Sequence, residues 1–161
     1  MFASGLLIGL LAYHFFIAPV ETVFSPGGGQ EIIDLFDSAE KSMDIEMYVF
    51  TSRDIVESLE RAKNRGVSIR IIIERSTISG SNDEIYRELA AKGFNIRYAS
   101  KDYKLTHSKF AIIDGRTVLV GSHNFSNSAL FENREASVIL HDPETANEFQ
   151  SVFDTDWAIA T

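Results

Sequence analysis

The sequence predicts an α/β fold in which helices cover both faces of a central mixed β-sheet. Short runs rich in β-branched residues alternate along the chain with segments of ten or more residues at helical spacing, an order typical of α/β domains. Residues 71–73 are continuously apolar, as expected of a strand that is covered on both faces. Asp114 and Gly115 separate two further apolar runs, which predicts a β-hairpin because a type I′ turn needs positive φ at both central residues.

The individual elements follow from periodicity and from the residues that end them. Two of the helices end in a way typical of helices: one at Arg65 and Gly66, a cation followed by a glycine, and the next at Gly93. Apolar residues at helical spacing predict helices over residues 30–41, 54–64, 82–92 and 143–157. Runs rich in β-forming residues predict strands over residues 43–50, 67–73, 94–99, 110–113, 118–120 and 136–140.

Composition narrows the class of protein. The chain has 161 residues, of which 45% are hydrophobic, enough for one globular domain with a real core. It has no cysteine, which excludes a disulfide framework and a cysteine-based zinc site. The net charge of −8 argues against a broad basic surface for nucleic acid, so a polyanionic substrate would need a local basic patch.

The first 20 residues are apolar apart from Ser4, His14 and the hydroxyl of Tyr13, and about 20 such residues can just span a bilayer. A buried core helix would show a polar stripe, which residues 2–12 lack. A cleaved signal peptide normally has a basic start, yet no Lys or Arg precedes Lys41. The sequence therefore predicts a membrane anchor over residues 1–20, with orientation left open, and a secreted protein if the segment is cleaved.

A breaker, Pro26 followed by three glycines, separates this segment from the rest of the chain. We therefore expect a linker over residues 21–29 and a catalytic domain over residues 30–161.

The chemistry is concentrated between His107 and Asn124. Alternate residues of a strand share a face, so His107 and Lys109 point the same way, and Ser122 and Asn124 have the matching relation if the chain stays extended there. An imidazole, an ammonium, a hydroxyl and an amide would then converge beside the hairpin. That set suits a phosphate, because it offers one nucleophile, one fixed charge and two neutral hydrogen-bonding groups.

The spacing His-x-Lys, four residues, Asp, six residues, Gly-Ser-x-Asn resembles the HKD signature of the phospholipase D superfamily. Glu135 stands where that family carries a glutamate that orients the histidine. A second His-x-Lys is absent from the sequence. The chain is therefore most similar to the single-motif members, which include Nuc-type endonucleases and the mitochondrial phospholipase D/Zucchini group.

The resemblance implies a phospholipase D-like sandwich that works as a homodimer, with the active site at the two-fold interface. One copy of His107 would attack the phosphorus and the other would protonate the leaving alcohol, with no metal or other cofactor. Lys109, Ser122 and Asn124 would bind the phosphate and Glu135 would orient the imidazole. Solvated or turn-forming roles remain open for Glu135, Ser122 and Asn124.

Other residues are assigned from the pattern itself. Asp114 lies at the hairpin turn, far along the strand from His107, so we expect it to be structural, and we place Gly121 in the same class. His123 is expected to be a partly exposed turn residue. Cations at or just after predicted strands are candidates for a substrate groove, although solvated charge is the alternative: Arg75, Arg97, Lys101 and Lys104.

The leading functional hypothesis is a phosphodiesterase that cleaves single-stranded DNA or RNA. A phospholipase D that acts on membrane phospholipid, such as phosphatidylcholine or cardiolipin, is the alternative. The third hypothesis is an inactive phosphate-binding or lipid-binding scaffold.

Overall fold

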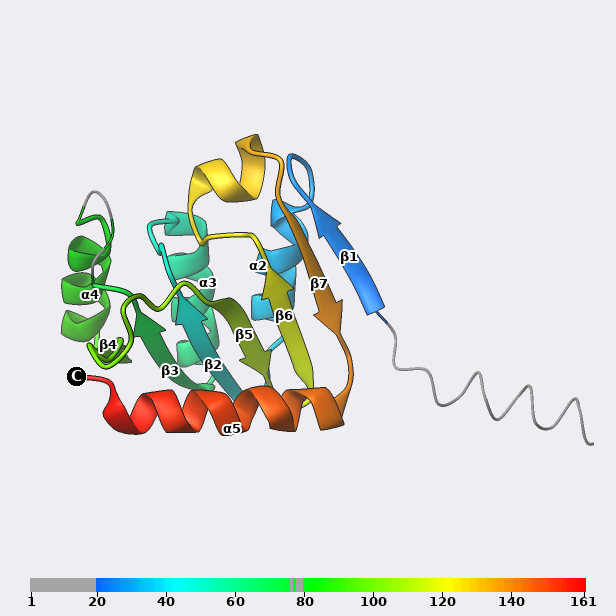
Figure 1. Cartoon of the computed structure of the whole chain (residues 1–161). Coiled ribbons are helices and arrows are strands. Elements are labelled where there is room, and N and C mark those ends of the chain that lie inside the picture. Colours follow the sequence, from blue (N-terminus) through cyan, green and yellow to red (C-terminus); the bar gives the residue numbers. More distant parts are fainter. Residues whose placement is uncertain (1–19, 76, 78–79) are drawn as a thin grey trace, which may run out of the picture.

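The computed structural model describes residues 20–75, 77 and 80–161. Within them, seven strands form one mixed sheet in the order β1-β7-β6-β5-β2-β3-β4 (Figure 1). The strands are β1 (Val20–Phe24), β2 (Ser42–Met47), β3 (Ser68–Ile73), β4 (Asn95–Tyr98), β5 (Lys109–Ile113), β6 (Thr117–Gly121) and β7 (Ala136–Leu140). The helices are α2 (Gly29–Asp37), α3 (Arg53–Asn64), α4 (Asn82–Ala91) and α5 (Pro143–Ile159), and η1 (Ser128–Glu132) is a single π-helical turn.

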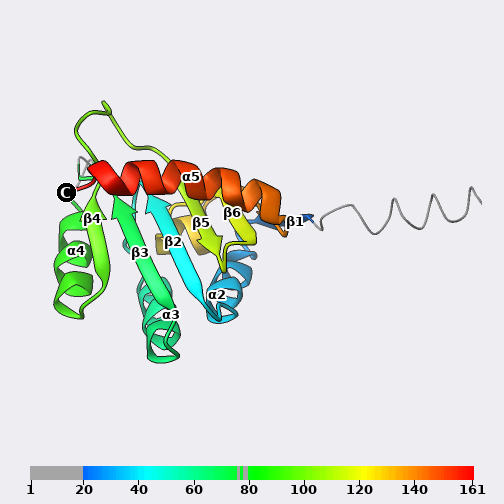
Figure 2. The same ribbon diagram turned by 90° about the horizontal axis from the view of Figure 1, so that it is seen from below.

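Helices cover the sheet on both faces. Figures 1 and 2 show α2, α3 and α4 on one face and α5 running across the other. Strands β2, β3 and β4 are parallel to one another, and the remaining neighbours pair antiparallel. The predicted α/β/α sandwich with a mixed sheet is confirmed.

Alternation along β2 shows how the two layers divide the residues. Met43, Ile45 and Met47 enter the larger core with α2, α3 and α4, whereas Asp44 and Glu46 point toward the α5 side. On that side Phe153 of α5 packs with apolar residues of the sheet in a second core. A strand covered on both faces can hold acidic residues only where polar partners are supplied, and Arg70 does so for Asp44 at 2.7 Å.

The expected linker over residues 21–29 is wrong in its first part. Val20–Phe24 forms β1, an edge strand that pairs antiparallel with β7 from Val20↔Leu140 to Phe24↔Ala136. Local pattern indicates this strand only weakly, because Val23 alone among its residues is fully buried. The folded domain therefore includes β1.

The predicted anchor over residues 1–20 lies outside the described residues except for Val20. No helix in the described part of the chain is long and apolar enough to cross a membrane.

The hairpin turn has the predicted conformation, with φ of 54° at Asp114 and 63° at Gly115. The Asp114 carboxylate accepts hydrogen bonds from the backbone N–H groups of Glu40, Lys41 and Ser42. Burial opposes ionisation of Asp114, but these backbone donors outweigh it and hold its pKa below the usual value. Asp114 thus fastens the hairpin to the loop before β2, at the edge of the sheet remote from His107.

Candidate active site

The candidate site lies at one end of the strands, where β2 and β6 end and β5 and β7 begin. We call this end of the strands the site edge. Register pairs Met47 of β2 with Lys109 at the start of β5, and Gly121 at the end of β6 with Ser137 near the start of β7. Side chains that follow or precede these positions therefore meet at the site edge. His107 comes from the loop before β5, and Glu135 comes from the segment just before β7.

His107 and Lys109 are in direct contact. The Lys109 ammonium lies 3.3 Å from Nδ1 and 3.5 Å from Nε2 of the imidazole, and it donates to the carbonyl oxygen of His107 at 3.0 Å. Tyr48, which follows β2, packs its ring 4.4 Å from the imidazole, centroid to centroid. Burial lowers the pKa of Lys109, and the negative charge of Glu135 opposes that shift. The site thus places a nucleophilic ring beside a cation that is close enough to share a phosphate with it.

Ser122 and Glu135 form a second pair. The Ser122 hydroxyl donates to Oε2 of Glu135 at 2.5 Å and accepts from the backbone N–H of Ala136 at 3.0 Å. Asn133 donates to the other carboxylate oxygen at 3.2 Å. The hydrogen bond from His107 to Glu135 that the resemblance implies is therefore not formed among the described residues. Glu135 acts on the site through its charge, and the Ser122 hydroxyl proton points at Glu135 instead of toward an open phosphate position.

Asn124 is partly buried, and its Oδ1 has no hydrogen-bond partner among residues 20–75, 77 and 80–161. A buried unpaired amide oxygen is costly, so this side chain keeps hydrogen-bonding capacity for a ligand.

The expectation of a partly exposed His123 is wrong. The imidazole is 2% exposed, with Nε2 2.7 Å from Ser25 Oγ and Nδ1 2.7 Å from Ser137 Oγ. Because Ser25 donates its proton to the Leu130 carbonyl, Nε2 of His123 is the donor to Ser25, and Nδ1 accepts from Ser137. Burial lowers the pKa of His123, and the negative charge of Glu135 opposes this shift only in part. The lowered pKa favours the neutral form of the ring. Alternation was the missed signal, since Ser122 and Asn124 face the site and the residue between them faces inward.

Gly121 is required by the close approach of β7. A Cβ at this position would collide with the Oγ and Cα of Ser137 and would lie 2.5 Å from the Ala136 carbonyl oxygen. β6, which leads to Ser122, and β7, which follows Glu135, therefore approach so closely here that a larger residue would force them apart.

The four candidate groove cations are divided by the fold. Arg75, Lys101 and Lys104 line a common surface cavity of about 250 Å³ together with Tyr103. Arg97 is not part of it. Its guanidinium stacks 4.2 Å from the Trp157 ring and donates to the Trp157 carbonyl at 2.7 Å. Arg97 lies on the α5 side of β4, apart from the cavity that the other three cations share, so its assignment to the groove stays a prediction.

Comparison with known proteins decides the family. Residues 32–157 match the family model described as "Cardiolipin synthase, PLD-like domain". The chain belongs to the phospholipase D superfamily. Its resemblance to the single-motif members is borne out by Nuc from Salmonella typhimurium, whose crystal structure is described as that of a phospholipase D family member. That structure superposes with a TM-score of 0.83 at 29% identity, over 89% of this chain and 96% of Nuc.

Curated relatives from the same superfamily carry lipid-related names. A mitochondrial cardiolipin hydrolase of Chlamydomonas reinhardtii is 33% identical over 135 residues, 83% of this chain and 59% of the relative. A phospholipase D of Rickettsia conorii is 31% identical over 132 residues, 81% of this chain and 65% of the relative. The chain therefore spans between about half and two thirds of the length of the curated relatives it matches.

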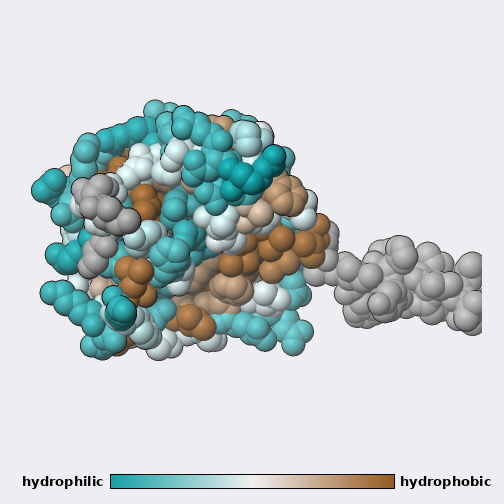
Figure 3. Space-filling view, turned by 45° about the horizontal axis from the view of Figure 1, so that its top comes forward, coloured by the Kyte–Doolittle hydropathy of each residue, from teal (hydrophilic) through white to brown (hydrophobic). Residues whose placement is uncertain are grey.

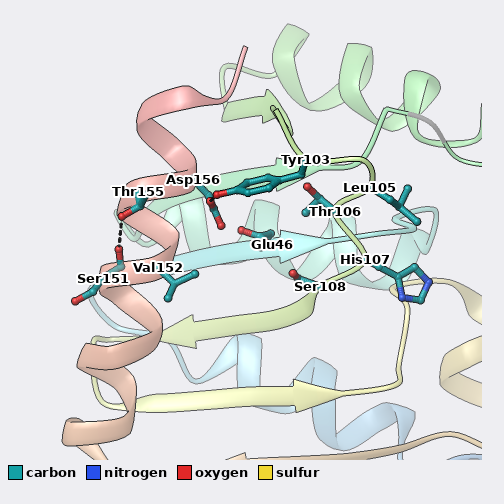
Figure 4. A pocket seen from close by; sticks show the side chains of 10 residues that line it. All are labelled: Glu46, Tyr103, Leu105, Thr106, His107, Ser108, Ser151, Val152, Thr155 and Asp156. Atoms are coloured by element: carbon teal, nitrogen blue, oxygen red, sulfur yellow. Dashed lines mark hydrogen bonds between the residues drawn. The ribbon is translucent and has the colours of Figure 1, made fainter. Parts of the chain in front are cut away.

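This phospholipase D superfamily domain also has a larger cavity that the sequence interpretation did not predict. It measures about 680 Å³ and lies between α5 and the loop that leads to His107 (Figure 4). Glu46 and Thr106 line it, and both side chains are buried. One signal was present in the sequence: Glu46 is a carboxylate inside a strand otherwise dominated by apolar residues.

Proposed function

We propose that this chain is a phosphodiesterase that works through a phosphohistidine intermediate and cleaves single-stranded DNA or RNA. The contact between His107 and Lys109 carries the proposal, because it sets a nucleophilic nitrogen 3.3–3.5 Å from a fixed cation. An imidazole nitrogen of His107 would form a bond to phosphorus while the bond from phosphorus to the leaving oxygen breaks. Lys109 would neutralise a non-bridging oxygen, and the side-chain NH2 group of Asn124 would donate to another, because its free Oδ1 can only accept.

The leaving oxygen needs a proton from a separate acid. We propose that a second copy of His107 supplies it, in a homodimer whose two-fold axis passes through the site. The same second imidazole would then take a proton from water, which attacks phosphorus and releases His107. Glu135 stabilises the imidazolium electrostatically, and a shift of its carboxylate away from Ser122 would free that hydroxyl for the phosphate. This scheme uses no metal ion.

The choice of nucleic acid rests on the cavity lined by Arg75, Lys101 and Lys104. These cations stand just after β3 and in the loop that follows β4, at the same edge of the sheet as His107. A local group of cations can hold successive phosphates even though the chain carries a net charge of −8. The similarity to Nuc over nearly the whole of that protein supports the same choice.

The substrate assignment is tested with the full chain in detergent, because a truncated chain that begins at Gln30 would lack β1. Single-stranded DNA, single-stranded RNA, duplex DNA and vesicles of phosphatidylcholine or cardiolipin are compared at equal phosphate concentration. We expect cleavage of the single strands, with rates that fall as salt rises and that persist in EDTA. Reproducible loss of activity on chelation, restored by one metal, would contradict the metal-independent mechanism.

A phospholipase D activity is the second candidate. Val20 and Phe24 of β1 are 56% and 51% exposed, and Figure 3 shows hydrophobic surface near the start of this strand. The names of the curated relatives, cardiolipin hydrolase and phospholipase D, point the same way. Together with the apolar residues 1–20, this surface supports a proposal that the domain is anchored to a membrane. Release of lipid headgroup without cleavage of nucleic acid would favour this candidate, and turnover of neither class would favour a scaffold.

The dimer is tested by mixing wild-type chains with His107→Asn chains after dissociation and reassembly. If each site needs both imidazoles, an equal mixture should retain about a quarter of the wild-type activity, because only wild-type homodimers are competent. Activity of about one half, in simple proportion to the wild-type fraction, would show that each chain works alone. Analytical ultracentrifugation of the same mixtures verifies that exchange has occurred.

A further inference from the structure

The cavity between α5 and the loop before β5 has no role in the chemistry assigned to His107. Figure 4 shows its walls: Glu46 from β2, the loop residues Tyr103, Leu105, Thr106, His107 and Ser108, and the side chains of Ser151, Val152, Thr155 and Asp156 from α5. His107 stands at the end of the cavity remote from α5. One ligand molecule could therefore occupy this cavity and also place a group, such as a phosphate, at the imidazole.

Two buried polar atoms in the wall have no partner in the part of the chain that the structure describes. They are Oε2 of Glu46, a residue that is 2% exposed, and Oγ1 of Thr106, which is 8% exposed. Folded proteins rarely leave such atoms unpaired, because each lost hydrogen bond is costly. Their presence in one cavity indicates a place that is built to receive hydrogen-bonding groups from outside the chain.

The carboxyl groups in the cavity wall determine which kind of ligand group the cavity can bind. Burial raises the pKa of Glu46 to about 7, the Ser108 hydroxyl opposes the shift, and neighbouring Asp156 reinforces it. Asp156 also accepts a hydrogen bond from the Tyr103 hydroxyl at 2.9 Å. Two carboxyl groups side by side repel phosphate and attract hydrogen-bond donors.

Apolar and aromatic side chains form part of the remaining wall, beside the hydroxyl groups of Ser108, Ser151 and Thr155. Leu105 and Val152 are 43% and 55% exposed, and Tyr103 is 47% exposed. Tyr103 also lines the smaller cavity that holds Arg75, Lys101 and Lys104. A chain of nucleotides could therefore place its phosphates on the cations of the smaller cavity and one base in the larger cavity. There the Tyr103 ring offers the base a stacking surface. A lipid headgroup has no planar group to stack on this ring and would meet its face only through an ammonium group.

We propose that this cavity binds the nucleobase next to the scissile phosphate, that Glu46 favours bases with an exocyclic amino group, and that the Thr106 hydroxyl binds either kind of base. The inference rests on the proposed nuclease function and adds a preference at one position to otherwise sequence-tolerant cleavage. The free carboxylate oxygen of Glu46 accepts from an amino group, as acidic side chains do from N4 of cytosine. A uracil or thymine carbonyl at the same place would face that oxygen and be repelled.

Cytidine and uridine 5′-monophosphates make a matched pair of probes, because their bases differ only in the groups at positions 3 and 4. Their Kd values for the full chain are measured by calorimetry in detergent at pH 8. We expect the cytidine nucleotide to bind about tenfold more tightly, the effect of one hydrogen bond to a charged acceptor. Glu46→Gln should remove or reverse this preference, because its amide can donate to the uracil carbonyl.

Asp44→Asn is the control variant, since Asp44 lies on the same strand and face but is bonded to Arg70. It should keep the preference. Thr106→Val is a second test with nearly unchanged volume, and it should weaken binding of both nucleotides. Circular dichroism checks that each variant is folded. Equal affinity for the two nucleotides in the wild type, or a preference that survives Glu46→Gln, would overturn the inference.

Phosphoethanolamine supplies the competing ligand class. Binding of phosphoethanolamine that depends on Glu46, without binding of the cytidine nucleotide, would replace the nucleobase by a lipid headgroup and overturn the inference. Monophosphate binding needs no hydrolysis, so it separates the two proposals. A Glu46-dependent preference in a chain that cleaves no polynucleotide would keep the base site and refute the nuclease. Cleavage of polynucleotides by a chain that shows no base preference would support the nuclease and refute the base site.

Discussion

His107→Asn should lower the rate of phosphodiester hydrolysis by at least about a thousandfold and leave the fold intact. The loss should be this large because, in the proposed mechanism, the same residue supplies both the nucleophile and the acid, one from each copy. The fold should survive because His107 is exposed and its side-chain contacts are with Lys109 and Tyr48. Steady-state rates on the preferred substrate and thermal denaturation of both proteins provide the measurements.

His141→Asn is the matched control, because His141 follows β7 at the opposite edge of the sheet. It is bonded to Thr117 and Glu21, so its replacement should change stability only slightly and leave the rate within about twofold. More than a few per cent of the wild-type rate in His107→Asn would refute the assignment of the nucleophile.

Gly121→Ala should destabilise the domain by at least about 3 kcal/mol and lower its melting temperature by about 10 °C. The added methyl group would meet the Ser137 and Ala136 backbone of β7, which cannot move as a flexible side chain can. Since β6 and β7 lead to Ser122, Asn124 and Glu135, activity should fall even at temperatures where the variant remains folded. Chemical denaturation and rates at low temperature measure the two effects.

Gly66→Ala tests whether the loss at Gly121 comes from crowding. Gly66 has φ of +91°, and no atom lies within 4 Å of the place that a methyl group would occupy. Alanine there should therefore cost only the strain of the left-handed backbone, about 1–2 kcal/mol. Gly66 lies after α3, away from the strands of the site, so the rate should be unchanged. Equal losses of stability in the two variants would show that β7 yields to the added methyl group.

The sequence by itself determined the residues of the motif and, apart from the turn η1, the order of the elements from residue 30 onward. Both depend on local rules. Helical spacing of apolar residues, cations and glycines at helix ends, and the Asp114–Gly115 turn act over a few residues, so they can be recognised without knowledge of the partner strands. The spacing from His107 to Asn124 is equally local, because one hairpin brings the two ends of the motif to the same edge.

Only the tertiary structure decided which side chains meet across distant strands. β1 joins the sheet through pairing with β7, more than 110 residues later in the chain, and little in its own sequence indicates that pairing. Ser122 is bonded to Glu135, His123 is enclosed by Ser25 and Ser137, and Arg97 is held by Trp157. The cavity at Glu46 exists because α5 crosses the sheet there without filling the space beside the loop. Such contacts depend on how whole elements pack, and periodicity within one element contains no information about the element that will cover it.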